Sequence, residues 1–243
     1  MKSSLLIAAS AILCSLGSTY GQASASPSPA ASAAPRPEVY QVHFNRAAPG
    51  KASALADFLK TPPTDPATAG HGLLLRHEDG ADWDYLALQD MGPKTTVEAS
   101  GNPRGPSMKG LSDWHDDTFA NGPAWAEFAK AMGLDADGKS KSADSVYVVS
   151  VYRPLPGHED ALEKYLNEPP SASGDLAVGT VLMQHLEGGA WRYLLISRYK
   201  SWQDFATSEA TSVAQSAKGQ GGWFTLREHI SFHNDTITYR IAP

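Results

Sequence analysis

The chain has 243 residues, of which 42% are hydrophobic and 19% charged, and its formal net charge is −6. This acidic balance, with no basic run, argues against nucleic acid or an anionic lipid surface as a partner. Because Cys14 is the only cysteine, no disulfide can form within the chain.

Residues 1–25 are predicted to be a signal peptide. Lys2 precedes an apolar run, Leu5–Leu16, and Ala23-Ser24-Ala25 offers the small residues that a signal peptidase requires. We therefore expect an exported protein, periplasmic or secreted. The run is shorter than the roughly 20 residues that a membrane-spanning helix needs, so no membrane anchor is expected after cleavage. Cleavage would also remove Cys14, and with it thiolate catalysis and cysteine metal ligands.

The sequence that follows repeats itself. Val39–Pro63 aligns without a gap with Val146–Pro170, and 11 of 25 positions are identical. The chain is therefore predicted to hold two copies of one fold unit. The predicted segments are a disordered Pro/Ala/Ser linker at 26–37, a first repeat at 38–134, a polar linker at 135–144 and a second repeat at 145–243.

Each repeat begins with a strand rich in β-branched and aromatic residues, Val39–Arg46 or Val146–Arg153, which ends before a Pro-Gly turn. An amphipathic helix follows, because apolar residues recur at i, i+1, i+4 and i+5 and can cover one buried face. Two further strands, separated by an acidic and Gly-rich loop, form a hairpin. The apolar helix positions are Ala54, Leu55, Phe58, Leu59, Ala161, Leu162, Tyr165 and Leu166, and the hairpin strands are Leu73–His77, Trp83–Leu88, Val181–His185 and Trp191–Ser197.

The end of the second repeat is predicted as a helix over Ser201–Ser208, another over Trp223–His233 and a final strand, Thr236–Ile241. In the first repeat an amphipathic stretch, Trp125–Met132, takes the place of this strand, so its fourth strand is expected to be short or missing. The order β-α-β-β-α-β is that of the ferredoxin-like unit. Its sheet has helices on one face only, and both open faces are apolar, so we expect the repeats to pack sheet to sheet as an eight-stranded barrel.

The strand-helix order, the Pro-Gly before the first helix and the duplication together resemble the dimeric α+β barrel superfamily in a fused, tandem form. The resemblance covers most of Glu38–Pro243. It implies an α+β fold class, two tandem ferredoxin-like repeats that form an intrachain dimeric barrel, and a monomeric pseudo-dimer. The superfamily includes small monooxygenases, haem-degrading enzymes and isomerases, so the resemblance implies a function on some small molecule but does not indicate which one.

Polar residues that occur in both repeats are the first candidates for a site, because packing alone does not require an imidazole or a carboxylate twice. His77 and His185 end equivalent strands and are predicted to face the barrel interior. As a pair they can bind a ligand, transfer a proton or ligate haem iron. The alternative is that each histidine caps a strand end and bonds the backbone of a loop.

A second duplicated set places His115 two residues before Asp117 and His233 two residues before Asp235. Each carboxylate can orient its histidine, as in a general base or a metal-bound imidazole. The alternative is that Asp-Thr forms a turn after a helix. His229 and His233 have the i, i+4 spacing of metal ligands on a helix, but two ligands make an incomplete site, and no metal is predicted.

A third set of candidates is aromatic and cationic. An aromatic pair on the third strand of each repeat is predicted to share one face and to stack on a flat ligand in the barrel, or alternatively to fill the core. The arginines that end the first strands can neutralise an anionic ligand or remain solvated. These residues are Trp83, Tyr85, Trp191, Tyr193, Arg46 and Arg153.

The sequence has no Gly-rich phosphate loop, no G-x-S-x-G and no H-E-x-x-H. The leading hypothesis is an exported small-molecule-binding barrel protein, acting as a cofactor-poor monooxygenase or isomerase on a small hydrophobic or aromatic ligand, with His77 or His185 as base. The alternatives are a non-catalytic binding or scaffold protein and a haem-binding protein. The cofactor stays open, haem included.

Overall fold

Eight strands form the framework of the fold. The computed structural model describes residues 35–61, 70–95, 97, 108–135, 137–139, 144–168, 175–187 and 190–243, so the predicted signal peptide, residues 26–34 and part of the second linker lie outside the described residues. The strands of the first repeat are β1 (Glu38–Ala47), β2 (Gly72–Asp79), β3 (Tyr85–Pro93) and β4 (Ser112–Gly122). Those of the second repeat are β5 (Val146–Pro154), β6 (Gly179–Glu187), β7 (Tyr193–Tyr199) and β8 (Ile230–Ala242).

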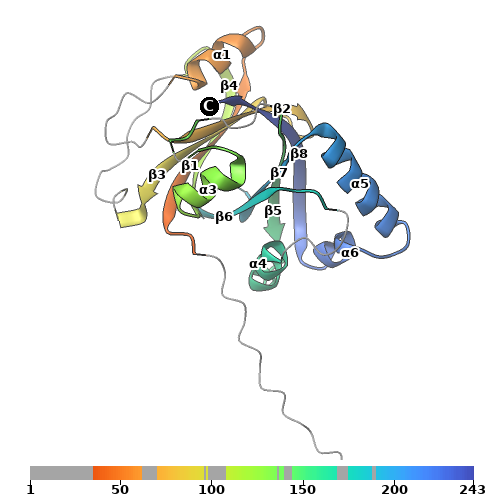
Figure 1. Ribbon diagram of the computed structural model, residues 1–243. Helices are drawn as coiled ribbons and strands as arrows, with labels where there is room; N and C mark the ends of the chain where they lie inside the picture. Colours follow the sequence, from red (N-terminus) through yellow and green to blue (C-terminus); the bar gives the residue numbers. More distant parts are fainter. Residues whose placement is uncertain are drawn as a thin grey trace, which may run out of the picture. The chain divides into compact units, whose positions relative to one another are not determined.

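The strands close into one barrel in the order β1-β3-β2-β8-β5-β7-β6-β4 (Figure 1). Each neighbouring pair is antiparallel, and the repeats join where β2 pairs with β8 and β4 with β6. Equivalent strands of the two repeats stand four places apart in this ring, so they run in the same direction. Equivalent residues therefore lie at the same end of the barrel. The predicted α+β barrel of two ferredoxin-like repeats is confirmed.

Strand alternation fills the barrel with apolar side chains. On β1 the inward positions are Tyr40, Val42 and Phe44, and their equivalents Tyr147 and Val149 on β5 belong to the same buried cluster. Large and β-branched side chains occupy the interior because both sheets turn their apolar face to it. Other members of this cluster are Leu73, Leu75, Leu86, Leu88, Val181, Met183, Leu194 and Ile196.

The helices α1 (Ala52–Leu59) and α4 (Glu159–Asn167) cover the outer faces of the two sheets. Leu55 and Ala56 of α1 pack on Leu74 and Tyr85, and Leu162 of α4 packs in the matching cluster of the second repeat. The second repeat has two more helices, α5 (Trp202–Ser216) and α6 (Gly222–Arg227). The Ser201 hydroxyl caps α5 by accepting a hydrogen bond from the backbone N–H of Asp204.

A short helix, α3 (Trp125–Met132), closes one end of the barrel. Figure 1 shows it in front of the strands, and its buried residues Phe128 and Met132 belong to the interior cluster. The Tyr40 hydroxyl donates to the carbonyl of Pro123 at 2.8 Å, and its equivalent Tyr147 donates to the carbonyl of Met132 at 2.9 Å. Both tyrosines stand near the start of their strands, so α3 covers the end where β1 and β5 begin.

Two predictions about the ends of the repeats are wrong. The first repeat has a full fourth strand, the 11-residue β4, and α3 follows this strand instead of replacing it. In the second repeat α6 ends at Arg227 and β8 already begins at Ile230. The extended pairing of β8 with β5 outweighs the helical pattern that the sequence shows there. Among the described residues, no helix is long and apolar enough to span a membrane.

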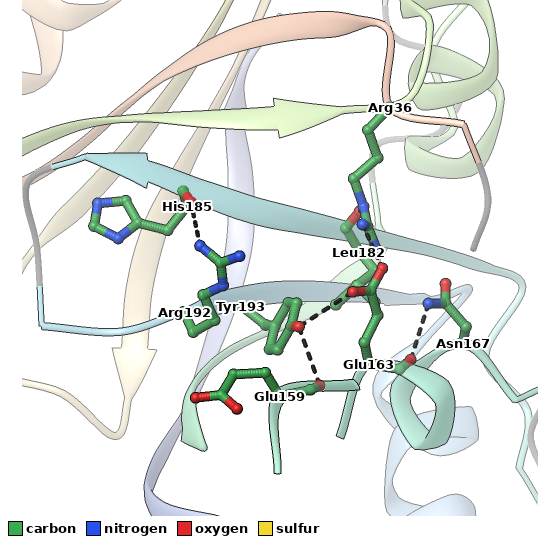
Figure 2. A network of polar contacts seen from close by, with 8 residues as sticks. All are labelled: Arg36, Glu159, Glu163, Asn167, Leu182, His185, Arg192 and Tyr193. Atoms are coloured by element: carbon green, nitrogen blue, oxygen red, sulfur yellow. Dashed lines mark hydrogen bonds and ion pairs between the residues drawn. The ribbon is translucent and has the colours of Figure 1, made fainter. Parts of the chain in front are cut away.

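A partly buried arginine, Arg36, links the start of the first repeat to the second. Arg36 precedes β1, and its Nη1 lies 2.6 Å from Glu163 Oε1 on α4, while its Nε donates to the carbonyl of Leu182 at 3.2 Å. Figure 2 shows the same carboxylate accepting from the Tyr193 hydroxyl. Arg36 was placed in a disordered linker by its Pro/Ala/Ser surroundings, and that assignment is wrong for this residue.

Candidate functional site

The clearest cluster of titratable side chains lies on the outer face of the first sheet. The pairing of β1 with β4 places His43 directly opposite Asp117. The His43 Nδ1–H donates a hydrogen bond to Asp117 Oδ1, and the other carboxylate oxygen lies 3.5 Å from His115 Nε2. Asp117 thus stands between two imidazoles, one held by a hydrogen bond and the other by a looser ion-pair contact.

Electrostatics favour the ionised carboxylate at this position. Burial opposes ionisation of Asp117, but the hydrogen bond from His43 and the charges of His43 and His115 outweigh it, so the pKa of Asp117 is lowered. An ionised Asp117 keeps the proton of His43 on Nδ1, which leaves a free lone pair on Nε2. Among the described residues nothing bonds this nitrogen, and the His43 side chain is 22% exposed. A small molecule can therefore reach it.

A buried amide stands next to this pair. Asn45 is the next outward-facing residue of β1 and is fully buried, opposite His115. Its Nδ2 donates to the carbonyl of His43 at 3.3 Å, while its Oδ1 has no partner among the described residues. A buried polar atom without a partner costs about 1–3 kcal/mol, so such atoms are often found where a ligand or water completes the site.

The second repeat does not reproduce this arrangement. Ser150 occupies the position of His43, opposite Asp235. His233 Nε2 lies 3.7 Å from Asp235 Oδ2, and its ring packs against Tyr152 and Trp223 at centroid distances of 6.3 and 5.2 Å. The carboxylate therefore has a neighbouring histidine in both repeats, but only the first repeat adds a second imidazole across the strand pair.

The duplicated histidines of the interior differ from each other. His185 is buried, its Nε2 contacts Thr118 Oγ1 at 2.6 Å, and its ring lies 4.7 Å from that of Trp191. His77 lies 5.8 Å from the ring of Trp83, and its buried Nε2 has no partner among the described residues. Both rings border the packed interior cluster. His185 Nε2 is thus already bonded within the chain, whereas His77 Nε2 is not.

The aromatic pairs expected on one face are divided between two. Trp83 and Trp191 belong to the interior cluster, but Tyr85 and Tyr193 point outward beneath α1 and α4. The Tyr85 hydroxyl donates to the carbonyl of Ala52, and the Tyr193 hydroxyl to that of Glu159. Each tryptophan precedes the first residue of its strand, so strand alternation does not apply to it. The shared face predicted for these residues is wrong.

The two arginines that end the first strands already have partners. Arg46 Nε donates to Asp113 Oδ1 at 2.9 Å, and Arg153 Nε donates to the carbonyl of Ala190 at 2.6 Å. Acidic neighbours, first of all the hydrogen-bonded Asp113, raise the pKa of Arg46. Arg153 also covers the Phe232 ring at 5.4 Å. The carboxylate that Arg46 binds is thus Asp113 of the chain itself, at the place where the sequence suggested an anionic ligand.

His229 has a partner that the spacing did not indicate. It lies between α6 and β8, so it shares no helical face with His233, and the helical i, i+4 pair is wrong. Its Nδ1 lies 3.0 Å from Nδ1 of His158. Across the described residues no group of three or more His, Cys, Asp or Glu side chains is arranged to hold a metal ion. A groove of about 570 Å³ follows α5 and is lined by none of these histidines.

No protein-family profile matches the sequence, and no curated protein matches it significantly. Solved structures do resemble the fold. A "putative monooxygenase" from Fusobacterium nucleatum subsp. nucleatum aligns with a TM-score of 0.52 at 9% identity, over 84% of this chain and 93% of that one. An "anthrone oxidase-like protein" aligns with a TM-score of 0.49 at 14% identity, over 86% and 93%.

The first of these alignments spans both repeats and shows a shared fold at an identity too low to carry function. The chain therefore has a dimeric α+β barrel fold, with both halves of the barrel in one polypeptide.

Proposed function

We propose that the protein is an enzyme that acts on a small molecule by abstracting a proton with His43. One observation carries this proposal: Asp117 accepts the Nδ1–H of His43, and Nε2 of the same ring is left free on a partly exposed surface. The arrangement is that of a general base held in one tautomer by a carboxylate. The interior histidines that the sequence favoured are less suited, because His185 Nε2 is already bonded and His77 lies beside a packed core.

The chemistry follows from the order of these groups. His43 Nε2 takes a proton from an acidic C–H or O–H of the substrate, and the imidazolium that forms is stabilised by ionised Asp117. Asn45 lies beside this base and donates its Nδ2–H to the carbonyl of His43. General-base catalysis of this kind typically contributes 10²- to 10⁴-fold to a rate, roughly 3 to 5 kcal/mol.

Proton abstraction is the shared first step of an isomerisation and of an oxygenation in which O₂ reacts with a substrate anion. Both fit the cofactor-poor class expected from the sequence. The likeness to a "putative monooxygenase" supports this choice at the level of fold alone. We place the activity in the first repeat, because Ser150 stands at the position of His43 in the second.

The proposal can be tested with a substrate that reports any general base, 5-nitrobenzisoxazole. A base removes its ring C–H proton, the N–O bond breaks, and a coloured nitrile phenolate forms. We expect His43→Ala to lower the protein-catalysed rate about 100-fold, within the range for a lost general base. His233→Ala is the matched control in the second repeat and is expected to keep the wild-type rate. Equal losses in both variants, or none in His43→Ala, would reject the proposal.

A further inference from the structure

Two histidines of the second repeat face each other outside the barrel interior. His158 is the residue before α4, and His229 stands between α6 and β8. Their Nδ1 atoms lie 3.0 Å apart, and the two ring planes are tilted by 50° with their centroids 5.3 Å apart. Both residues are partly exposed, so small ions of the solvent have access to them. We call these two residues the histidine pair.

The backbone holds both histidines in place. The N–H of Leu155 donates to the carbonyl of His229 at 2.8 Å, and the N–H of His158 donates to the carbonyl of Leu155 at 3.0 Å. The His158 carbonyl in turn accepts from the N–H of Leu162 at 2.9 Å. Leu162 and Ile230 are buried in the same hydrophobic cluster. The two segments that carry the imidazoles are therefore fixed relative to each other before any ligand binds.

The first repeat builds the same backbone without histidines. There the N–H of Ala48 donates to the carbonyl of Leu111 at 2.8 Å, and the N–H of Lys51 donates to the carbonyl of Ala48 at 2.8 Å. Lys51 is equivalent to His158, and Leu111 is equivalent to His229. The fold thus forms this turn with a lysine and a leucine and does not require an imidazole at either position. The histidine pair therefore points to a chemical role that the second repeat alone has.

The separation of the two nitrogens suits two ligands of one metal ion. Imidazole nitrogens bind a transition-metal ion at about 2.0 Å, so two of them stand about 2.8 Å apart at a right angle and about 3.3 Å apart at a tetrahedral angle. The observed 3.0 Å lies between these values. Without a metal the two Nδ1 atoms share one proton. An ion takes the place of this proton, and the ring that donated it then carries its proton on Nε2.

The charge around the histidine pair favours a cation. Within two positions of either histidine the sequence has three acidic residues, Glu159, Asp160 and Glu228, and one basic residue, Arg227. The excess of negative charge stabilises a positive ion nearby. Two imidazoles are fewer than the three protein ligands of a catalytic zinc site, so water fills the remaining positions of the ion. Partly exposed side chains leave room for this water.

We propose that the histidine pair binds one transition-metal ion, independently of the chemistry at His43. The two Nδ1 atoms are the protein ligands. Imidazole suits Cu²⁺, Ni²⁺ and Zn²⁺, and with the same ligands Cu²⁺ binds most tightly of the three. The bound ion links the turn before α4 to the start of β8.

Isothermal titration of the metal-free full chain with Cu²⁺ tests this site. We expect one tightly bound ion per chain, and weaker binding of Zn²⁺. The double variant with His158→Lys and His229→Leu carries the residues of the first repeat, so it is expected to fold. It should bind Cu²⁺ about 100-fold more weakly, because the two linked ligands are lost. The matched control, with His43→Ala and His115→Ala, removes the two imidazoles beside Asp117 and should change the affinity less than about threefold.

A second measurement uses the wild-type protein alone. Cu²⁺ is paramagnetic and broadens the NMR signals of nuclei near it. When less than one equivalent is added to ¹⁵N-labelled protein, the backbone N–H signals of His158 and His229 should disappear before those of His43 and His115.

The proposal is overturned if Cu²⁺ does not bind at millimolar concentration, or if the double variant binds it as tightly as the wild type. Broadening that begins at other histidines also overturns it. The double variant should keep the wild-type 5-nitrobenzisoxazole rate, so a failure of this proposal is distinguishable from a failure of the role given to His43. A lost rate in a folded double variant would show that the two sites are not independent.

Discussion

Replacing Asp117 by asparagine tests how far the carboxylate controls His43. The substitution keeps the size of the side chain but removes the charge that accepts the His43 Nδ1–H. A hydrogen bond to a charged group contributes about 1.5–3 kcal/mol. At 1.36 kcal/mol for each factor of ten, its loss from the transition state lowers the rate about 10- to 150-fold. Asp235→Asn, at the equivalent position of the second repeat, should leave the rate unchanged.

The pH dependence of this variant gives an independent check. The pKa of Asp117 is lowered from its ordinary value of 3.8, so its contribution is complete above that value and is lost as the pH falls through the folded-state pKa. Above about pH 8, where an ordinary imidazole is neutral, the ratio of the wild-type rate to that of Asp117→Asn should therefore be constant up to about pH 9. The assay is the initial rate with 5-nitrobenzisoxazole across this range. A ratio that varies strongly with pH, or a rate as high as that of the wild type, would refute the role given to Asp117.

Three further predictions concern stability. Phe128→Ala removes a fully buried ring of α3 and should lower the free energy of unfolding in urea by about 3–5 kcal/mol. Lys130→Ala, at an exposed position of the same helix, should change it by less than about 0.5 kcal/mol. Similar values for both variants would show that α3 does not close the barrel. Arg36→Ala leaves Glu163 without its cation and should destabilise the protein by about 1–3 kcal/mol. If the Arg36–Glu163 pair accounts for this loss, Arg36→Ala should cause no further destabilisation in a protein that already carries Glu163→Gln. Burial, with Glu163 nearby, raises the pKa of Tyr193 to about 12. The contribution of Tyr193 to the free energy of unfolding is therefore complete below about pH 10 and is lost as the pH rises through 12. Tyr193→Phe should reduce the fall in stability at alkaline pH, and an unchanged fall would contradict this reasoning.

The duplication was sufficient to predict the barrel. Identical residues at equivalent positions, such as Val39 with Val146 and the Pro-Gly turns, identified two copies of one unit, and an apolar open face on each copy required that they pack together. The fourth strand of the first repeat was missed because Trp125–Met132 has a strong helical pattern, which was taken to replace the strand instead of following it. Only pairing with β1 and β6 shows that Ser112–Gly122 forms a strand.

The same reliance on duplicated residues explains why His43 was missed. His43 aligns with Ser150 of the second repeat, so it is not among the polar residues that occur in both repeats. Its partner Asp117 was recognised, but was assigned to His115, its neighbour in sequence. The signal that could have found His43 is the alternation of β1, which puts Gln41, His43 and Asn45 on one polar face. Joining that face to Asp117 requires the strand register, which depends on long-range pairing.

Chemical rescue tests the central claim most directly. If His43 Nε2 is the base, the cavity left by His43→Ala can admit free imidazole, which takes the proton in its place. We predict that imidazole restores the 5-nitrobenzisoxazole rate of His43→Ala in a saturable manner, and that it stimulates the wild type and His233→Ala only by its slow background reaction. Identical, non-saturating stimulation of all three proteins by imidazole would contradict the account.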